Sequence, residues 1–206
     1  SFGFSLNDDS VEVGSQFGGI VYVSSEDIDV EALELDFEGF SEYPRYCESN
    51  PEVWERTKNI KVPFGEIELH SLIFTLPTSY LLKLDLHQIS EKMSKMHQTI
   101  INFIGSSLVT PIRIVFDIEV ASDQNSTGYP IVEKIDMIEP LFTNLNKPNI
   151  ELFNLMIRIA NSNIRENCFD PNTEKAFATV AACLAFREIF PDFTISKLPS
   201  FEKPKL

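Results

Sequence analysis

Two acidic residues, Asp117 and Glu119, have the type and spacing best suited to chemistry. They stand one residue apart in an apolar run from Phe116 to Val120. Side chains alternate between the two faces of a strand, so both carboxylates would point to one side and could together hold Mg²⁺. Such a site needs further acids, and the one candidate, Asp170, suits the N-cap of a helix because a proline follows it. The pair is therefore either a metal site or the solvated face of a strand.

The same run is similar to a known motif. The first acidic motif of the DnaQ-like and B-family polymerase exonucleases resembles Phe116-Asp117-Ile118-Glu119-Val120. This resemblance implies a metal-dependent nuclease in which Asp117 and Glu119 hold two divalent ions. The formal net charge of -14 opposes it, since an acidic surface repels a phosphate backbone. We keep the exonuclease as the alternative function.

The negative charge is concentrated in the first third of the chain. Of 31 acidic residues, sixteen lie in residues 1–70 against four basic ones, which accounts for -12 of the -14. This distribution argues against binding to nucleic acids or to anionic lipid, whereas basic protein partners fit it. Within the acidic region 24–58 we expect five carboxylates to contact such a partner: Glu26, Asp27, Asp29, Glu48 and Glu52.

Other chemical signatures are missing from the sequence. There is no GxGxxG, P-loop, nucleophile elbow or HExxH, and neither the three histidines nor the three cysteines have metal-ligand spacing. We therefore expect no cofactor, no small-molecule substrate and no enzymatic activity. No apolar run reaches the ~18 residues of a membrane span, and no signal peptide is visible, which favours a cytoplasmic protein.

The first part of the chain is predicted to be mainly β. Alternating apolar residues, turn residues and prolines predict strands over 11–23, 30–40, 66–76, 112–120 and 131–139, with a long loop over 41–58. One helix is expected over 86–104, because Asp85 suits its N-cap, apolar residues recur every three to four positions, and Gly105 suits its end.

After Pro148 the pattern becomes helical. One amphipathic helix is expected around residues 152–159, and Asp170 followed by Pro171 predicts the start of a second. We expect this helical pair to pack through its Phe and Leu side, notably Phe177 and Leu184, on a partner or on the chain's own sheet. The predicted organisation is a β domain over 1–148 and a helical segment and tail over 149–206.

The order of motifs over residues 5–141 resembles the N-terminal lobe of the arrestin fold. The segments that carry the resemblance are the Gly-containing strand Val13–Val23, Ala32–Gly39 with its "F-x-G" ending, Val62–Pro77 with "P-x-G" and "F-x-L-P", Phe103–Gly105 with Ile112–Val120, and Met137–Leu141. The resemblance implies an antiparallel β-sandwich, interrupted here by the helix at 86–104 and followed by the helical pair.

An arrestin-like lobe implies a non-enzymatic adaptor in membrane-protein sorting or vesicle traffic. It would act through protein–protein contacts, as a cargo adaptor for a ubiquitin ligase or as a subunit of a complex such as a Rab exchange factor. The chain lacks a basic cluster for phosphorylated tails and a PPxY motif. The expected location is cytoplasmic, with peripheral association at Golgi, endosomal or plasma membrane as an option.

Overall fold

In the computed structural model, the described residues are 12, 14, 18–23, 36–105, 111–117, 130–164 and 170–197. The strands are β1 (Arg45–Cys47), β2 (Phe64–Glu68), β3 (Leu72–Pro77), β4 (Ile112–Asp117) and β5 (Ile131–Lys134). The helices are α1 (Pro51–Thr57), α2 (Thr78–Leu81), α3 (Leu86–Ile104), α4 (Ile138–Phe142), α5 (Ile150–Asn163) and α6 (Pro171–Ile189), with 3-10 turns at Ile135–Met137 and Ile195–Lys197.

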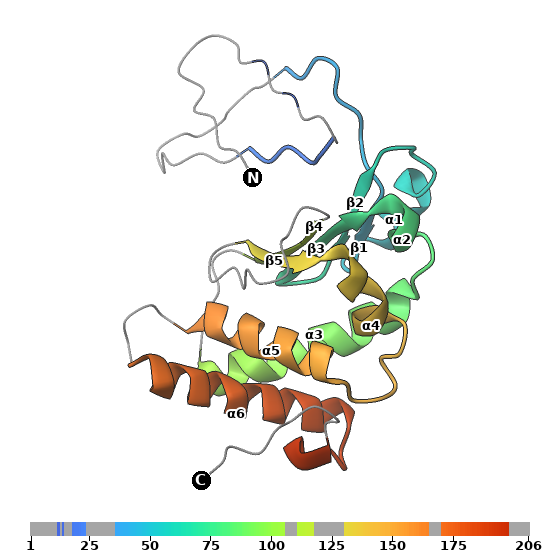
Figure 1. Ribbon diagram of the computed structural model, residues 1–206. Coiled ribbons are helices and arrows are strands. Elements are labelled where there is room, and N and C mark those ends of the chain that lie inside the picture. Colours follow the sequence, from blue (N-terminus) through green and yellow to red (C-terminus); the bar gives the residue numbers. More distant parts are fainter. Residues whose placement is uncertain are drawn as a thin grey trace.

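The five strands form a single mixed sheet whose spatial order follows the chain, β1-β2-β3-β4-β5. Only β2 and β3 are antiparallel; β1 is parallel to β2, and β3, β4 and β5 are parallel to one another. Helices α3, α5 and α6 lie together on one side of this sheet (Figure 1). The predicted arrestin-like sandwich is therefore wrong: a layer of helices covers the sheet where a second sheet was expected.

The expected strand over 66–76 is in fact a hairpin. Strands β2 and β3 pair with Glu68 opposite Ile73, and Leu69 N donates to Leu72 O at 2.8 Å across the turn. The apolar residues change parity at this turn, from odd positions in β2 to even positions in β3. Four residues separate the paired Glu68 and Ile73, and an even number makes paired positions differ in parity, so both strands keep one apolar face.

Helix α3 is present over the predicted residues. The Asp85 side chain accepts from Gln88 N at 3.0 Å, and Gly105 ends the helix with a φ of 72°, a left-handed conformation that suits glycine. Its buried residues Ile89, Met93, Met96 and Ile100 belong to the core that the sheet and the helices share. The start of α6 is also as predicted, since Asp170 accepts from the backbone of Asn172 and Thr173.

Several other segments differ from the prediction. The loop expected over 41–58 contains β1 and α1, and the strand expected over 131–139 ends at Lys134, where a 3-10 turn and α4 follow. Residues 18–23 and 36–40 are not strands, while 24–35 lie outside the described residues. The strand expected to reach residue 120 is described as far as Asp117.

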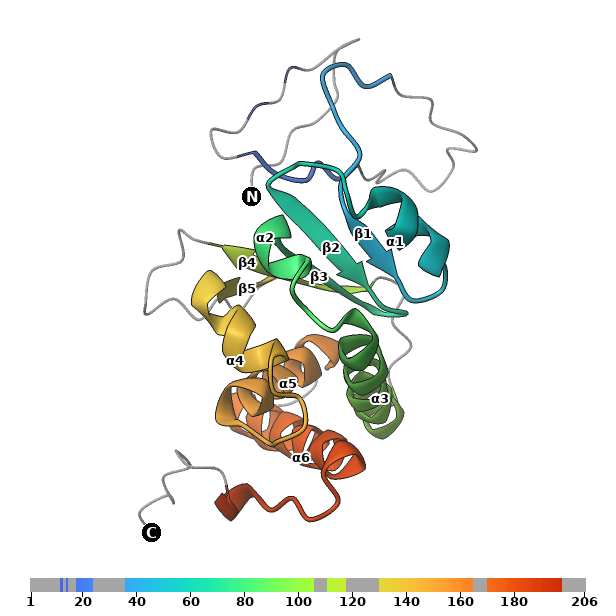
Figure 2. The same cartoon turned by 90° about the vertical axis from the view of Figure 1, so that its right-hand side faces the viewer.

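Two faces of the sheet have different coverings. The helical face carries the alternate, fully buried side chains of β3 and β4 (Leu72, Phe74, Leu76, Ile112, Ile114 and Phe116), which share one apolar core with the helices. The outer face carries the intervening side chains of β2, β3 and β4, including Glu66, Thr75 and Arg113. The described part of the N-terminal region lies on this side of the sheet (Figures 1 and 2).

Candidate functional site

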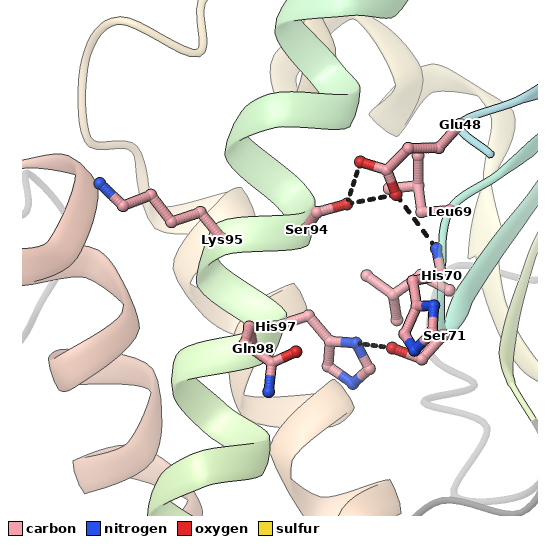
Figure 3. Close-up of a pocket in the computed structure, with 9 residues that line it drawn as sticks. Glu48, Leu69, His70, Ser71, Ser94, Lys95, His97 and Gln98 are labelled. Atoms are coloured by element: carbon pink, nitrogen blue, oxygen red, sulfur yellow. Dashed lines mark hydrogen bonds between the residues drawn. The ribbon is translucent and has the colours of Figure 1, made fainter. Parts of the chain in front are cut away.

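A cleft of about 400 Å³ lies where the turn after β2 meets the middle of α3. Its lining residues are Glu48, Leu69, His70, Ser71, Leu72, Ser94, Lys95, His97 and Gln98 (Figure 3). Glu48 directly follows β1 and Leu69 directly follows β2, so the cleft sits at the carboxyl ends of two parallel strands. In α/β proteins this is the edge of the sheet where ligands commonly bind.

Glu48, one of the residues expected to contact a partner, points at α3. Its carboxylate accepts from Ser90 Oγ at 2.8 Å, from Ser94 Oγ at 3.0 Å and from the backbone N–H of His70 at 3.2 Å. These bonds join the end of β1, the β2–β3 turn and α3. The carboxylate is thus engaged within the chain (Figure 3).

His97 is the most buried polar group of the cleft, with 1% of its surface exposed. Its Nδ1 lies 2.9 Å from Ser71 Oγ, and its Nε2 lies 3.4 Å from the Asn163 amide nitrogen, which also donates to Ile159 O at 2.7 Å. An amide nitrogen can only donate, so Nε2 is the acceptor and Nδ1 carries the proton. His97 therefore donates to Ser71, and it does not activate Ser71 as a nucleophile in this arrangement.

The His97 imidazole is neutral at pH 7. Burial, together with the smaller effect of the neighbouring His70, lowers its pKa from 6.5 to about 4. Lys95 pairs with Glu188 at 3.1 Å, and Gln98 donates to Asn102 at 2.9 Å. The polar side chains that line the cleft are thus mainly engaged in hydrogen bonds and ion pairs within the chain. Within the described ranges, no three His, Cys, Asp or Glu side chains come together to hold a metal ion.

The remaining predicted acids are placed as follows. Asp117 ends β4 and stands opposite Lys134 in the ladder with β5, while Glu119 lies outside the described residues, so the exonuclease pair stays a prediction. Glu52 is exposed in the first turn of α1. The three other acids expected to contact a basic partner, Glu26, Asp27 and Asp29, also lie outside the described residues.

Helix α6 turns its small residues inward and several large apolar ones outward. Its buried positions include Ala178, Ala181, Ala182 and Ala185, which repeat at three and four residues. A stripe of this kind lets α3 and α5 approach α6 closely. Only Phe186 adds a large buried side chain to this face.

The outward side chains form a surface that we call the apolar strip, made of Phe103, Phe177, Val180 and Leu184. The exposed fractions are 38% for Phe103, 49% for Val180 and 36% for Leu184, and the Phe103 and Phe177 rings stack at 4.9 Å. Phe177 and Leu184 are the two residues for which the sequence predicted either a partner contact or packing on the sheet. The structure places Leu184 beside Val180 at the surface, and it places the half-buried Phe177 against Phe103.

Comparison with protein-family models, with curated proteins and with solved structures found no match for this chain. Among the described residues, none of the helices has the length and apolar character to cross a lipid bilayer.

Proposed function

We propose that this chain is a protein-interaction subunit that binds an amphipathic helix of a partner protein on the apolar strip. The observation that carries the proposal is the spacing of Phe177, Val180 and Leu184 at i, i+3 and i+7 along α6. This is the seam spacing through which one helix packs on another. Phe103 from α3 widens the seam, so the partner helix would lie over two helices.

Exposure of the strip supports the proposal energetically. Isolated apolar side chains at the surface are common, but adjoining ones form a patch whose burial contributes roughly 25 cal/mol per Å². The pair of Lys95 and Glu188 gives α3 and α6 a polar boundary away from the Phe103–Phe177 stack. A partner helix would therefore meet an apolar centre and a polar rim, as in other protein interfaces.

Charge defines the partner further. At a formal net charge of -14, the chain attracts cations and repels acidic proteins at long range. The fitting occupant is a helix with one apolar side and basic flanks. The sorting, ubiquitin-ligase and Rab-exchange roles, with their membrane locations, followed from the arrestin resemblance. The single mixed sheet gives them no support, and they stay predictions.

Site-specific photo-crosslinking in the full chain tests this proposal. A benzoylphenylalanine at Val180 should crosslink to a basic amphipathic helix of another protein, whereas the same group at exposed Lys83 should not. Leu184→Asp should abolish the crosslink from position 180 while leaving the melting temperature unchanged. Equal crosslinking from both positions would contradict a specific site, and a crosslinked dimer of this chain would replace the partner by a second copy.

A further inference from the structure

The outer face of the sheet holds a buried carboxylate, Glu66, which is 3% exposed. Its Oε1 accepts from Thr75 Oγ1 at 3.0 Å and pairs with Arg113, and its Oε2 accepts from Tyr43 OH at 2.8 Å. A buried charge is tolerated only when it is paired and hydrogen-bonded in this way. We call the surface formed by Tyr43, Glu66, Thr75 and Arg113 the Glu66 socket.

Tyr22 fills this socket from a distant part of the chain. Its hydroxyl donates to Glu66 Oε1 at 2.5 Å and lies 3.1 Å from Thr75 Oγ1, while its ring stacks on the Arg113 guanidinium at 3.7 Å. The phenol therefore meets a carboxylate with its hydroxyl and a cation with its face. The residue is 47% exposed as a whole, but desolvation of its hydroxyl and the adjacent Glu66 raise the pKa of Tyr22, which keeps the hydroxyl protonated as a donor.

The backbone around Tyr22 is held lightly. Val21 and Val23 are 47% and 45% exposed, and across residues 19–23 the hydrogen bonds to the described part of the chain all come from the Tyr22 side chain. Gly18 rests against Pro63, so closely that a Cβ there would come within 2.7 Å of Pro63 Cγ. Within the described residues 19–23, Tyr22 is the anchor.

The socket does not need Tyr22 to keep its charge satisfied. Without the Tyr22 hydroxyl, Glu66 still has Arg113 and Thr75 at Oε1 and Tyr43 at Oε2. Removing Tyr22 therefore leaves no uncompensated buried charge, which is the main cost of breaking such a group. The socket residues therefore satisfy the Glu66 carboxylate among themselves.

We propose that the Glu66 socket is a recognition site for an unmodified tyrosine on an extended segment, and that the chain's own Tyr22 occupies it in cis. A phenylalanine would leave the hydroxyl position empty, and a phosphotyrosine would bring a dianion against the Glu66 carboxylate. Tethering gives Tyr22 a high effective concentration, so a tyrosine from another chain binds only after Tyr22 has left.

The test is a titration of the ¹⁵N-labelled full chain with the blocked peptide of residues 18–23, followed by NMR. In Tyr22→Ala, the peptide should cause saturable shifts at the Thr75 and Arg113 amides, with at least tenfold weaker binding to the wild-type chain. The same peptide with phenylalanine in place of its tyrosine should bind at least tenfold more weakly, and its phosphotyrosine form should cause no shift.

Two further variants keep the test decisive. Val23→Ala, which changes an exposed neighbour, should behave as the wild type; Tyr22→Phe, which keeps the stacked ring, replaces Tyr22→Ala if that variant does not fold and should bind the peptide better than the wild type. Equal binding to wild type and variant, equal binding of the phenylalanine peptide, or no shift in a folded variant would each overturn the proposal.

Discussion

The two faces of the sheet use neighbouring residues of the same strands in opposite ways. On the helical face, Phe74 and Phe116 are fully buried and both pack edge-on to Phe142 of α4, with ring centroids 5.3 and 5.8 Å apart. On the outer face, Glu66 and Arg113 form a charged group that side chains from outside the sheet complete. The helical face is apolar and buried under helices, whereas the outer face is polar and is covered by a few side chains.

The two sides of the sheet also differ in how a buried ionisable group is accommodated. Among the helices, His97 is buried without a counter-charge and stays neutral because desolvation lowers its pKa. On the outer face, Glu66 has four donors around its carboxylate. Glu133 and Arg158 form a charged pair on the helical side, but at the sheet edge, on β5. The helical layer thus supplies stability, whereas the outer face supplies a specific and replaceable contact.

Phe74→Ala tests the stabilising role of the helical face and should have the largest effect. Loss of a fully buried ring should lower the free energy of unfolding by about 3–5 kcal/mol, because it leaves a cavity beside Phe142. Urea denaturation measures this loss. The control, Phe40→Ala, removes a 48% exposed ring and should cost less than about 1 kcal/mol; equal losses would remove the contrast between the regions.

Acidification tests the neutral state of His97. Its pKa in the folded chain, about 4, lies below the 6.5 of the unfolded chain, so the unfolded state binds a proton first as pH falls. Stability is therefore fully present above pH 6.5 and is lost toward pH 4, by roughly 2 kcal/mol between pH 7 and pH 5.

Urea unfolding of wild type, His97→Gln and His87→Gln at pH 7 and pH 5 measures this loss of stability on acidification. The loss should disappear in His97→Gln and persist in His87→Gln, which changes an exposed residue of the same helix. If His97→Gln loses as much stability on acidification as the wild type, the histidine is not the group responsible.

Glu66→Gln tests whether the outer face depends on its charge. The amide keeps the shape but removes the counter-ion of Arg113 and presents a donor to neighbouring hydroxyls, so the free energy of unfolding should fall by roughly 1–2 kcal/mol. Glu68→Gln, on the same strand and face, breaks only a 3.5 Å pair with Arg45 and should cost less than about 0.5 kcal/mol. Similar values for the two variants would contradict a special role for Glu66.

Leu184→Ser should have the smallest effect on folding. The side chain is 36% exposed on the apolar strip, so its loss should change the free energy of unfolding by less than about 0.5 kcal/mol. Buried Ala185 next to it provides the comparison, since Ala185→Ser places a hydroxyl at the tight contact of α6. A large loss from Leu184→Ser would show that the strip is part of the core.

The elements that the sequence predicted well have local signals at their ends. For α3 these are Asp85 at its start and Gly105 at its end, and for α6 they are Asp170 and Pro171 at its start, all of which act within one turn of the helix. Strand β1 has only three residues and carries no such signal. Strand direction and the number of sheets depend on contacts between distant segments, so alternation in residues 66–76 was equally compatible with a sandwich.

The site was predicted only in part, for related reasons. Phe177 and Leu184 were selected as apolar, but which side of α6 is buried depends on how closely the helices approach. The repeat of alanines at 178, 181, 182 and 185 was the available signal. Glu48 was selected for its charge, whereas its serine partners on α3 are more than forty positions away. The Glu66 socket joins four segments, and no local pattern marks it.

The order of the strands also determines what happens while the chain is being made. Strands β1 to β5 are synthesised in the order in which they lie side by side, and α5 and α6 follow them. The 40 or so residues from Ile150 to Ile189 take roughly 2–8 s at 5–20 residues per second. For those seconds Phe116 and its apolar neighbours lack part of the cover that α5 and α6 later provide.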